Sequence, residues 1–210
     1  MIRNKRILVL APHTDDGEFG CGGTIARLIE EENEVYYMAF SACQQSVLPQ
    51  FPPDILVKEV KEAAAILGVK KENLILLDYE VRTFNYKRQE ILDDILKVKA
   101  EVKPDVVFLP SIRDIHQDHF TITNEGIRAF KFSSILCYEL PWNNFSFDTT
   151  AFFRLSDRHV EIKCKALSAY KSQAHRSYAN VEFIQSLARV RGVQSGNELA
   201  EVFEIIRWVY

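Results

Sequence analysis

The chain has 210 residues, of which 47% are hydrophobic and 26% are charged. This composition supplies enough apolar side chains for the core of one domain and excludes a disordered chain. The formal net charge of -3 provides no basic surface for a phosphate backbone, so we expect no nucleic-acid partner. No apolar stretch reaches the roughly 18 to 20 residues that span a bilayer, and the apolar run at 7–11 is too short for a signal peptide.

The cysteines indicate a reducing environment. Cys21, Cys43, Cys137 and Cys164 are scattered along the chain without CxxC spacing. This pattern favours free thiols over a disulfide framework or a cysteine metal site. We therefore expect a cytoplasmic protein.

Apolar segments alternate with segments of helical spacing through the first 140 residues. The run RILVLA at 6–11 ends at a proline and predicts a buried strand. The polar loop after it leads into a predicted helix at 22–33. Further strands are predicted at 34–42, 74–78, 105–110 and 135–140, and further helices at 54–67 (ending at Gly68), 87–102 and 120–130.

This alternation is typical of a parallel sheet that is covered by helices on both faces. We therefore predict a doubly wound, Rossmann-like α/β core over 1–140. The last part of the chain has two helical stretches, 159–173 and 180–192, and a final strand at 199–210, without another clear strand–helix–strand unit. We predict that 141–210 is a small C-terminal α/β extension that borders the active site, and that 1–210 forms a single domain.

Two polar loops follow predicted strands and together hold three of the five histidines. His13 and Asp16 follow the first strand, and His119 follows the strand that ends at Pro110. In open α/β sheets, ligands bind outside the carboxyl ends of the strands, so we expect these loops to meet. Two ligands from one loop and one from another suit a catalytic zinc ion that keeps one position open. The pattern predicts metal-assisted hydrolysis.

Other residues of the two loops can supply the remaining chemistry. Asp15 lies between the first two candidate ligands and is available as a base. Hydrolysis also needs a group that meets the oxyanion, and His116 lies three residues before His119. Asp118 is a candidate to fix a histidine tautomer or to stabilise an imidazolium. For Glu18 two interpretations remain open, orientation of a ligand or interaction with free backbone N–H groups at the helix start.

Two segments resemble the motifs of a known family. PHTDDGEFGCGGTIA at 12–26 resembles the PHxDDxExGxGGT signature of the LmbE/PIG-L family of zinc-dependent N-acetylglucosaminyl deacetylases, and DIHQDH at 114–119 resembles its HPDH motif. Weaker likenesses are found at 58–69, 163–173 and 196–203, so the similarity covers nearly the whole chain. His175 and Arg176 directly follow the second of these segments and are candidates for the edge of the pocket.

The resemblance implies one zinc ion per chain on His13, Asp16 and His119, with Asp15 as general base and His116 as the group that stabilises the oxyanion. It implies hydrolysis of the acetamide of a 2-acetamido sugar or its conjugate, with release of acetate. The native metal stays open between zinc and ferrous iron. The expected partner is a small amino-sugar substrate, and the late aromatic residues are compatible with a homo-oligomer.

The chain departs from the family motifs at a few positions. Thr14 and Gln117 each replace a proline, and neither position holds a ligand or a base. Leu56 stands where many members carry an arginine near the substrate. Lys58 and Arg82 are candidates to replace that arginine.

Four residues are predicted to contact the substrate, and each has an alternative role. Asp114 can bind a sugar hydroxyl, orient His116 or cap a turn. Arg113 and Arg82 can bind a phosphate or carboxylate of the substrate, or be surface charges. Trp142 can stack on a sugar ring, or pack in the core or against another subunit.

Two other functions remain open from the sequence. The same metal site can hydrolyse another small amide, and a non-catalytic α/β module can use the same loops to bind a nucleotide or a sugar. A screen of N-acetyl compounds for released acetate separates these functions.

Overall fold

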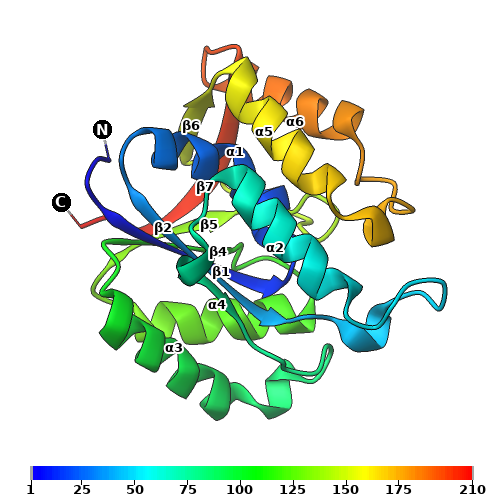
Figure 1. The fold of residues 1–210 in the computed structure, drawn as a ribbon. Helices are drawn as coiled ribbons and strands as arrows, with labels where there is room; N and C mark the ends of the chain where they lie inside the picture. The colour runs from blue at the N-terminus through cyan, green and yellow to red at the C-terminus, as the bar shows by residue number, and fades with distance from the viewer. Residues whose placement is uncertain (1, 210) are drawn as a thin grey trace.

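The computed structural model describes residues 2–209, which contain one seven-stranded sheet and six α-helices (Figure 1). The strands are β1 (Arg6–His13), β2 (Glu34–Ser41), β3 (Leu74–Leu76), β4 (Val106–Pro110), β5 (Ser134–Tyr138), β6 (Ala151–Leu155) and β7 (Leu199–Arg207). The α-helices are α1 (Asp16–Glu30), α2 (Ile55–Leu67), α3 (Arg88–Val102), α4 (Gln117–Ala129), α5 (Asp157–Ser168) and α6 (Val181–Gln194). Short 3-10 helices lie at Gln44–Ser46, Lys71–Asn73, Phe84–Tyr86 and Lys171–Gln173.

The strand order is β3-β2-β1-β4-β5-β7-β6. Strands β1 to β5 are parallel, and β7 runs antiparallel to both β5 and β6. The chain therefore winds outward from β1 in one direction and from β4 in the other. This arrangement confirms the predicted doubly wound, mostly parallel α/β fold.

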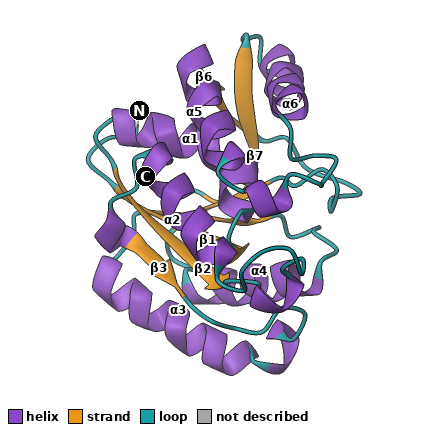
Figure 2. Ribbon diagram, turned by 45° about the vertical axis from the view of Figure 1, so that its right-hand side comes forward, coloured by secondary structure: helices purple, strands orange, loops and turns teal. Residues whose placement is uncertain are grey.

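The sheet has a hydrophobic core on each face, because side chains alternate along every strand. In β1, Ile7 and Val9 face the core shared with α1, α2, α5 and α6, whereas Leu8 and Leu10 face the core shared with α3 and α4. Figure 2 shows the two groups of helices on opposite sides of the sheet. Burial on both faces explains why the β1 sequence is a continuous apolar run.

The C-terminal part contains a strand that the sequence interpretation missed. β6 pairs with β7, and β7 lies between β5 and β6 in the same sheet. The segment Ala151–Leu155 is half-buried at the sheet edge, so it lacks the continuous apolar run of the central strands. The predicted final strand ends at Arg207 in the structure, and Tyr210 lies outside the described residues.

Two helices begin earlier than the sequence predicted. α1 begins at Asp16 instead of 22, so Asp16 lies in its first turn. α4 begins at Gln117 instead of 120, because the His116 side chain caps it by accepting a hydrogen bond from the Asp118 N–H. Histidine is not among the preferred N-cap residues, so no capping signal was visible at this position. The second motif is therefore part of a helix start and not only of a loop.

A buried ion pair connects α1 to the C-terminal part of the chain. α1 is kinked at Cys21, whose φ is -145°. Beyond the kink, the backbone N–H groups of Gly23 and Thr24 donate to the two carboxylate oxygens of Glu201 on β7, at 3.0 and 2.6 Å. Lys163 of α5 donates to Glu201 and to the Phe19 carbonyl oxygen, both at 2.6 Å. Glu201 thus supplies the acceptors that the kinked helix needs.

Gly20 allows α1 to approach Tyr138 of β5 closely. A Cβ atom at Gly20 would lie 2.2 Å from Cδ2 of the fully buried Tyr138 ring. We expect Gly20→Ala to lower the free energy of unfolding by about 1 to 3 kcal/mol, measured by urea denaturation, because the ring cannot move aside in a packed core. Gly22→Ala is the matched control, since its Cβ would meet Cγ of Lys163 at 3.1 Å, a contact that needs a much smaller shift. An equal loss in both variants would contradict this explanation.

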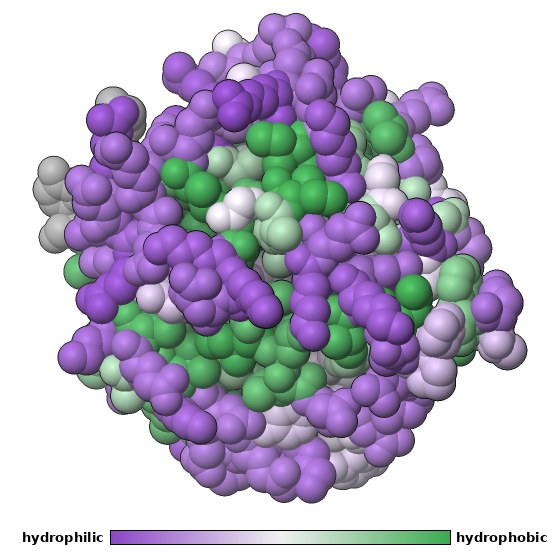
Figure 3. All heavy atoms as spheres, in the orientation of Figure 1, coloured by the Kyte–Doolittle hydropathy of each residue, from purple (hydrophilic) through white to green (hydrophobic). Residues whose placement is uncertain are grey.

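One face of the outer surface is mostly polar. Figure 3 shows hydrophilic residues over most of the visible face, with hydrophobic residues mainly in its middle. Among residues 2–209, no helix is both long enough and apolar enough to cross a membrane.

Candidate active site

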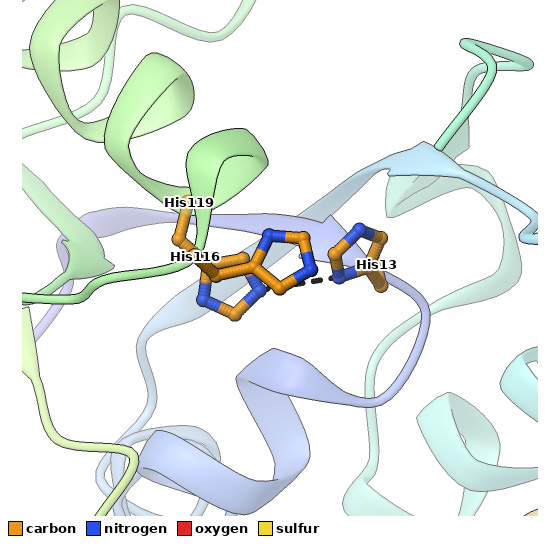
Figure 4. A group of neighbouring side chains, drawn as sticks. All are labelled: His13, His116 and His119. Carbon is orange, nitrogen blue, oxygen red and sulfur yellow. Dashed lines mark hydrogen bonds between the residues drawn. The ribbon is translucent and has the colours of Figure 1, made fainter. Parts of the chain in front are cut away.

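The two motifs meet because β1 and β4 are parallel neighbours. His13 is the last residue of β1, and the segment that carries His116 and His119 follows β4 at the same edge of the sheet. This edge lies at the point where the winding direction reverses, the usual ligand site of such folds. Figure 4 shows His13 at the end of its strand and His116 and His119 at the start of their helix, with the rings turned toward one another.

Three donor atoms converge at the centre of the site. Nδ1 of His13 lies 3.1 Å from Oδ2 of Asp16 and 3.2 Å from Nε2 of His119, and Nε2 of His119 lies 3.2 Å from the same Asp16 oxygen. In a tetrahedral site with bonds of about 2.1 Å, the ligand atoms are about 3.4 Å apart. The spacing and the chemistry of these donors fit a single divalent cation.

Two buried carboxylates bind the rings of His13 and His119 on the side away from the centre of the cluster. Oδ2 of Asp118 lies 3.1 Å from Nε2 of His13, and Oδ2 of Asp114 lies 2.7 Å from Nδ1 of His119. Each carboxylate binds one nitrogen of its histidine ring, and the second nitrogen of the same ring is directed at the centre of the cluster. Such carboxylates fix the tautomer of metal-binding histidines and increase their basicity.

The cluster favours positive charge at its centre. Burial opposes protonation of His119, but Asp16 and Asp114 outweigh burial and raise its pKa to about 10. Burial also opposes ionisation of Asp16, yet the charges of His119 and His13 hold its pKa well below the usual range. The negative charges that retain the proton on His119 would also attract a metal cation. A proton and a metal cation compete for the same ring nitrogen.

Asp15 differs from its neighbour Asp16. Its side chain does not cap α1, and it lines the pocket in front of the cluster. Burial, followed by the charge of Asp16, raises the pKa of Asp15 to about 6. A carboxylate with a pKa in this range can both accept and return a proton near neutral pH.

His116 lies beside the other two histidines but is held differently. The centroid of its ring is 5.0 Å from that of His13 and 4.6 Å from that of His119, and a ligand atom of each of the three residues lies within 4.8 Å of the others. Burial, followed by the charges of His119 and His13, lowers the pKa of His116 to about 4. Its Nδ1 accepts the Asp118 N–H, so the neutral ring carries its proton on Nε2.

Glu18 lies beneath the loop that carries His13 and Thr14. It is fully buried and accepts hydrogen bonds from the hydroxyl groups of Tyr37 and Tyr170. Both hydroxyl groups also lie within hydrogen-bonding distance of the Thr14 carbonyl oxygen. Burial raises the pKa of Glu18 to about 8. Neither interpretation from the sequence describes this network, because its tyrosines come from β2 and from the segment after α5.

The histidine cluster opens into a pocket of about 400 Å³. Two of the four residues predicted to contact substrate, Arg82 and Trp142, line it. Asp114 does not, because its buried carboxylate binds His119, receives the His116 N–H and adjoins Asn143. Its predicted contact with a sugar hydroxyl does not fit this position.

Arg113 also lies away from the pocket lining. Its guanidinium group donates to Glu204 at 2.6 Å and to Asp148 at 2.7 Å. The sequence could not show that β7 brings Glu204 next to this loop. Arg113 is therefore an ion-paired residue that connects the loop after β4 to β7, and not a residue of the pocket lining.

The C-terminal part supplies pocket residues that had little or no sequence signal. Gln173, Arg176 and Tyr178 line the pocket, and the Tyr178 ring is stacked on Trp142 with ring centroids 3.8 Å apart. Arg176 had been a candidate for the pocket edge through the family-like segment before it, whereas Tyr178 had no such signal. His175, the other candidate, is not among the lining residues.

Comparison with known proteins identifies the family. The family model described as PIG-L, GlcNAc-PI de-N-acetylase, matches residues 8–130. The chain belongs to the PIG-L family. This membership confirms the resemblance that the two motifs indicated.

Relatives of this PIG-L family chain extend the similarity to nearly its full length. The diacetylchitobiose deacetylase of Thermococcus kodakarensis is 25% identical over 230 residues, which cover 98% of this chain and 85% of the relative. The solved structure of N,N'-diacetylchitobiose deacetylase from Pyrococcus horikoshii, complexed with its inhibitor MPG, has 25% identity and a TM-score of 0.80 over 96% of this chain and 84% of that one. A conserved protein from Thermus thermophilus has 25% identity and a TM-score of 0.81, with coverage of 98% and 96%. The PIG-L family chain is thus an amide hydrolase of the deacetylase type.

Proposed function

We propose that this PIG-L family chain is a zinc-dependent deacetylase that removes the N-acetyl group from an N-acetylglucosamine-type sugar or its conjugate and releases acetate. The observation that carries the proposal is the convergence of His13, Asp16 and His119 donor atoms within 3.2 Å of one another, beside Asp15 in a pocket. The family model is named for a GlcNAc conjugate, and two relatives are named for diacetylchitobiose. These names support an acetylated amino sugar as the substrate class.

In this proposal, Nδ1 of His13, Oδ2 of Asp16 and Nε2 of His119 would hold the zinc ion. His116 is a rival ligand, because it belongs to the same histidine cluster. The hydrogen bonds argue against that role. Carboxylates orient the rings of His13 and His119, whereas His116 receives a backbone N–H on Nδ1, which makes Nε2 a weaker ligand and a better proton donor.

When bound, the zinc ion would supply a Lewis acid that lowers the pKa of water and polarises a carbonyl group. The protein residues perform the proton transfers. Asp15 accepts a proton from the attacking water on its carboxylate and returns it to the departing amine nitrogen. His116, neutral and protonated on Nε2, donates a hydrogen bond to the amide oxygen as negative charge develops there. Asp118 acts by orienting His13.

We also propose a cytoplasmic location for the enzyme. All four cysteines are free thiols, and Cys21, Cys137 and Cys164 are buried. Free thiols suit a reducing compartment.

Acetate release from N-acetylglucosamine and simple glycosides of it tests the proposed function. We expect turnover with zinc, loss of turnover with a chelator, and recovery when zinc is added back. An N-acetylated alkylamine without a sugar ring is the control substrate. The proposal is wrong if the zinc-loaded enzyme releases acetate from none of the sugars, or if it prefers the control.

Asp114→Asn should weaken zinc binding by about 10- to 100-fold, because the buried carboxylate that orients His119 is lost. Competition with a chromophoric chelator measures this affinity. Asp148→Asn is the control, since Asp148 is exposed and pairs with Arg113 away from the cluster. Unchanged zinc affinity in Asp114→Asn would show that Asp114 does not support the ligand.

A further inference from the structure

Arg82 and Arg176 have side chains with no carboxylate partner within ion-pair distance among the described residues, and both line the pocket. Both are exposed, so they stand where the pocket meets solvent. Arg113, by comparison, is neutralised by Glu204 and Asp148. Uncompensated guanidinium groups in a pocket are candidates for binding an anion.

Neighbouring groups fix the backbone of Arg82 and the side chain of Arg176. The backbone N–H of Arg82 donates to Oδ2 of Asp118 at 2.6 Å, with a positive φ of 69° at Arg82, and its Nη2 donates to the Ser46 hydroxyl at 3.5 Å. The Arg176 Nε donates to Oε1 of Gln173 at 2.7 Å, and its Nη1 donates to the Tyr178 hydroxyl at 2.9 Å. Both partners of Arg176 are neutral, so they orient the guanidinium group without cancelling its charge.

The charges of the pocket also favour an anionic ligand. The carboxylates of the site, Asp15, Asp16, Asp114 and Asp118, lie at or behind the histidine cluster, where a divalent cation would offset their charge. The two guanidinium groups pair with none of these carboxylates. A neutral sugar would leave both arginines uncompensated, whereas a substrate with a negative group would satisfy them.

We propose that Arg82 and Arg176 form an anion-binding subsite at the pocket mouth, so that the preferred substrate carries a carboxylate or phosphate on the part of the molecule away from its acetamide. The inference rests on the proposed function, since it specifies the substrate of that site. It assigns Arg176, which lies outside both sequence motifs, a role in substrate specificity.

A matched series of N-acetylglucosamine glycosides tests the subsite. The aglycones have equal length and end in a hydroxyl, a carboxylate or a phosphate. We expect kcat/KM for at least one anionic glycoside to exceed that for the neutral glycoside by about fivefold or more at low ionic strength, mainly through a lower KM, and the difference to shrink as salt is added. The better of the two anionic glycosides identifies the chemistry of the bound group.

The arginine variants attribute the preference to these residues. R82Q and R176Q should each lower the ratio of anionic to neutral kcat/KM, and the double variant should bring it to about one. R176K should retain part of the preference, because it keeps the charge. R189Q is the matched control, since Arg189 is exposed, pairs with Glu198 and lies outside this pocket. Equal kcat/KM for neutral and anionic glycosides, or a preference that survives in the double variant, would overturn the inference.

Calorimetric binding of the corresponding free-amine glycosides separates this inference from the proposed function. Tighter binding of the anionic glycosides, lost in the double variant, would support the subsite even if no acetate were released from any substrate. Acetate release without any difference in binding or kcat/KM would keep the deacetylase and remove the subsite.

Discussion

Asp15→Asn is expected to keep the metal and to release acetate at least about 100-fold more slowly, because asparagine has the shape of aspartate but cannot accept the proton of the attacking water. Asp15 lines the pocket, and its side chain does not cap α1. The fold and the cluster of His13, Asp16 and His119 should therefore be preserved. Acetate release and zinc content, measured on the same preparation, give the comparison.

Asp93→Asn is the matched control for this substitution, since Asp93 is exposed on α3 and is not among the residues that line the pocket. It should behave like the unaltered chain in both measurements. A zinc-loaded Asp15→Asn protein with full activity would remove Asp15 as the base. Loss of zinc in that variant would instead make Asp15 a ligand.

His119→Ala is expected to lose both zinc and activity. The side chain of His119 is buried between Asp16 and Asp114, so its removal takes away one donor atom and deprives each of two buried carboxylates of one partner. Elemental analysis should find well under one zinc per chain, and acetate release should fall to the background rate. Circular dichroism determines whether the variant is folded.

Two further variants keep this prediction testable if His119→Ala does not fold. His13→Ala removes a half-buried ligand and should also lose zinc. His175→Ala is the control, because His175 is exposed and absent from the pocket lining, and it should keep zinc and activity. Stoichiometric zinc in folded His119→Ala or His13→Ala would contradict the proposed ligand set.

The central strands and the meeting of the two motifs were predictable from the sequence, because they follow from local patterns and from the rules of parallel sheets. The apolar run in β1 and the alternation of strands and helices set the fold, and the fold brings His13 and His119 to one edge. His13 and Asp16 are only three residues apart, so their convergence needs no contact between distant segments.

Features that depend on contacts between distant segments were not predictable. Asp114 had three open roles, contact with a sugar hydroxyl, orientation of His116 and capping of a turn. Its contact with His119, only five residues on, depends instead on the exact course of the loop backbone. Arg113 had no visible partner in sequence, since Glu204 lies 91 residues away. β6 was missed because a half-buried edge strand lacks a continuous apolar run.

The bond between Glu201 and the kinked α1 has a consequence for variants far from the motifs. A chain shortened to the part that the family model matches, 8–130, would lose both Glu201 and Lys163, and two backbone amides of the helix that carries Asp16 would have no acceptor. Deletions that remove the C-terminal part of the chain should therefore destabilise the fold. In a random mutagenesis screen for weakened zinc retention, hits should also map to β7, although this strand contributes no ligand.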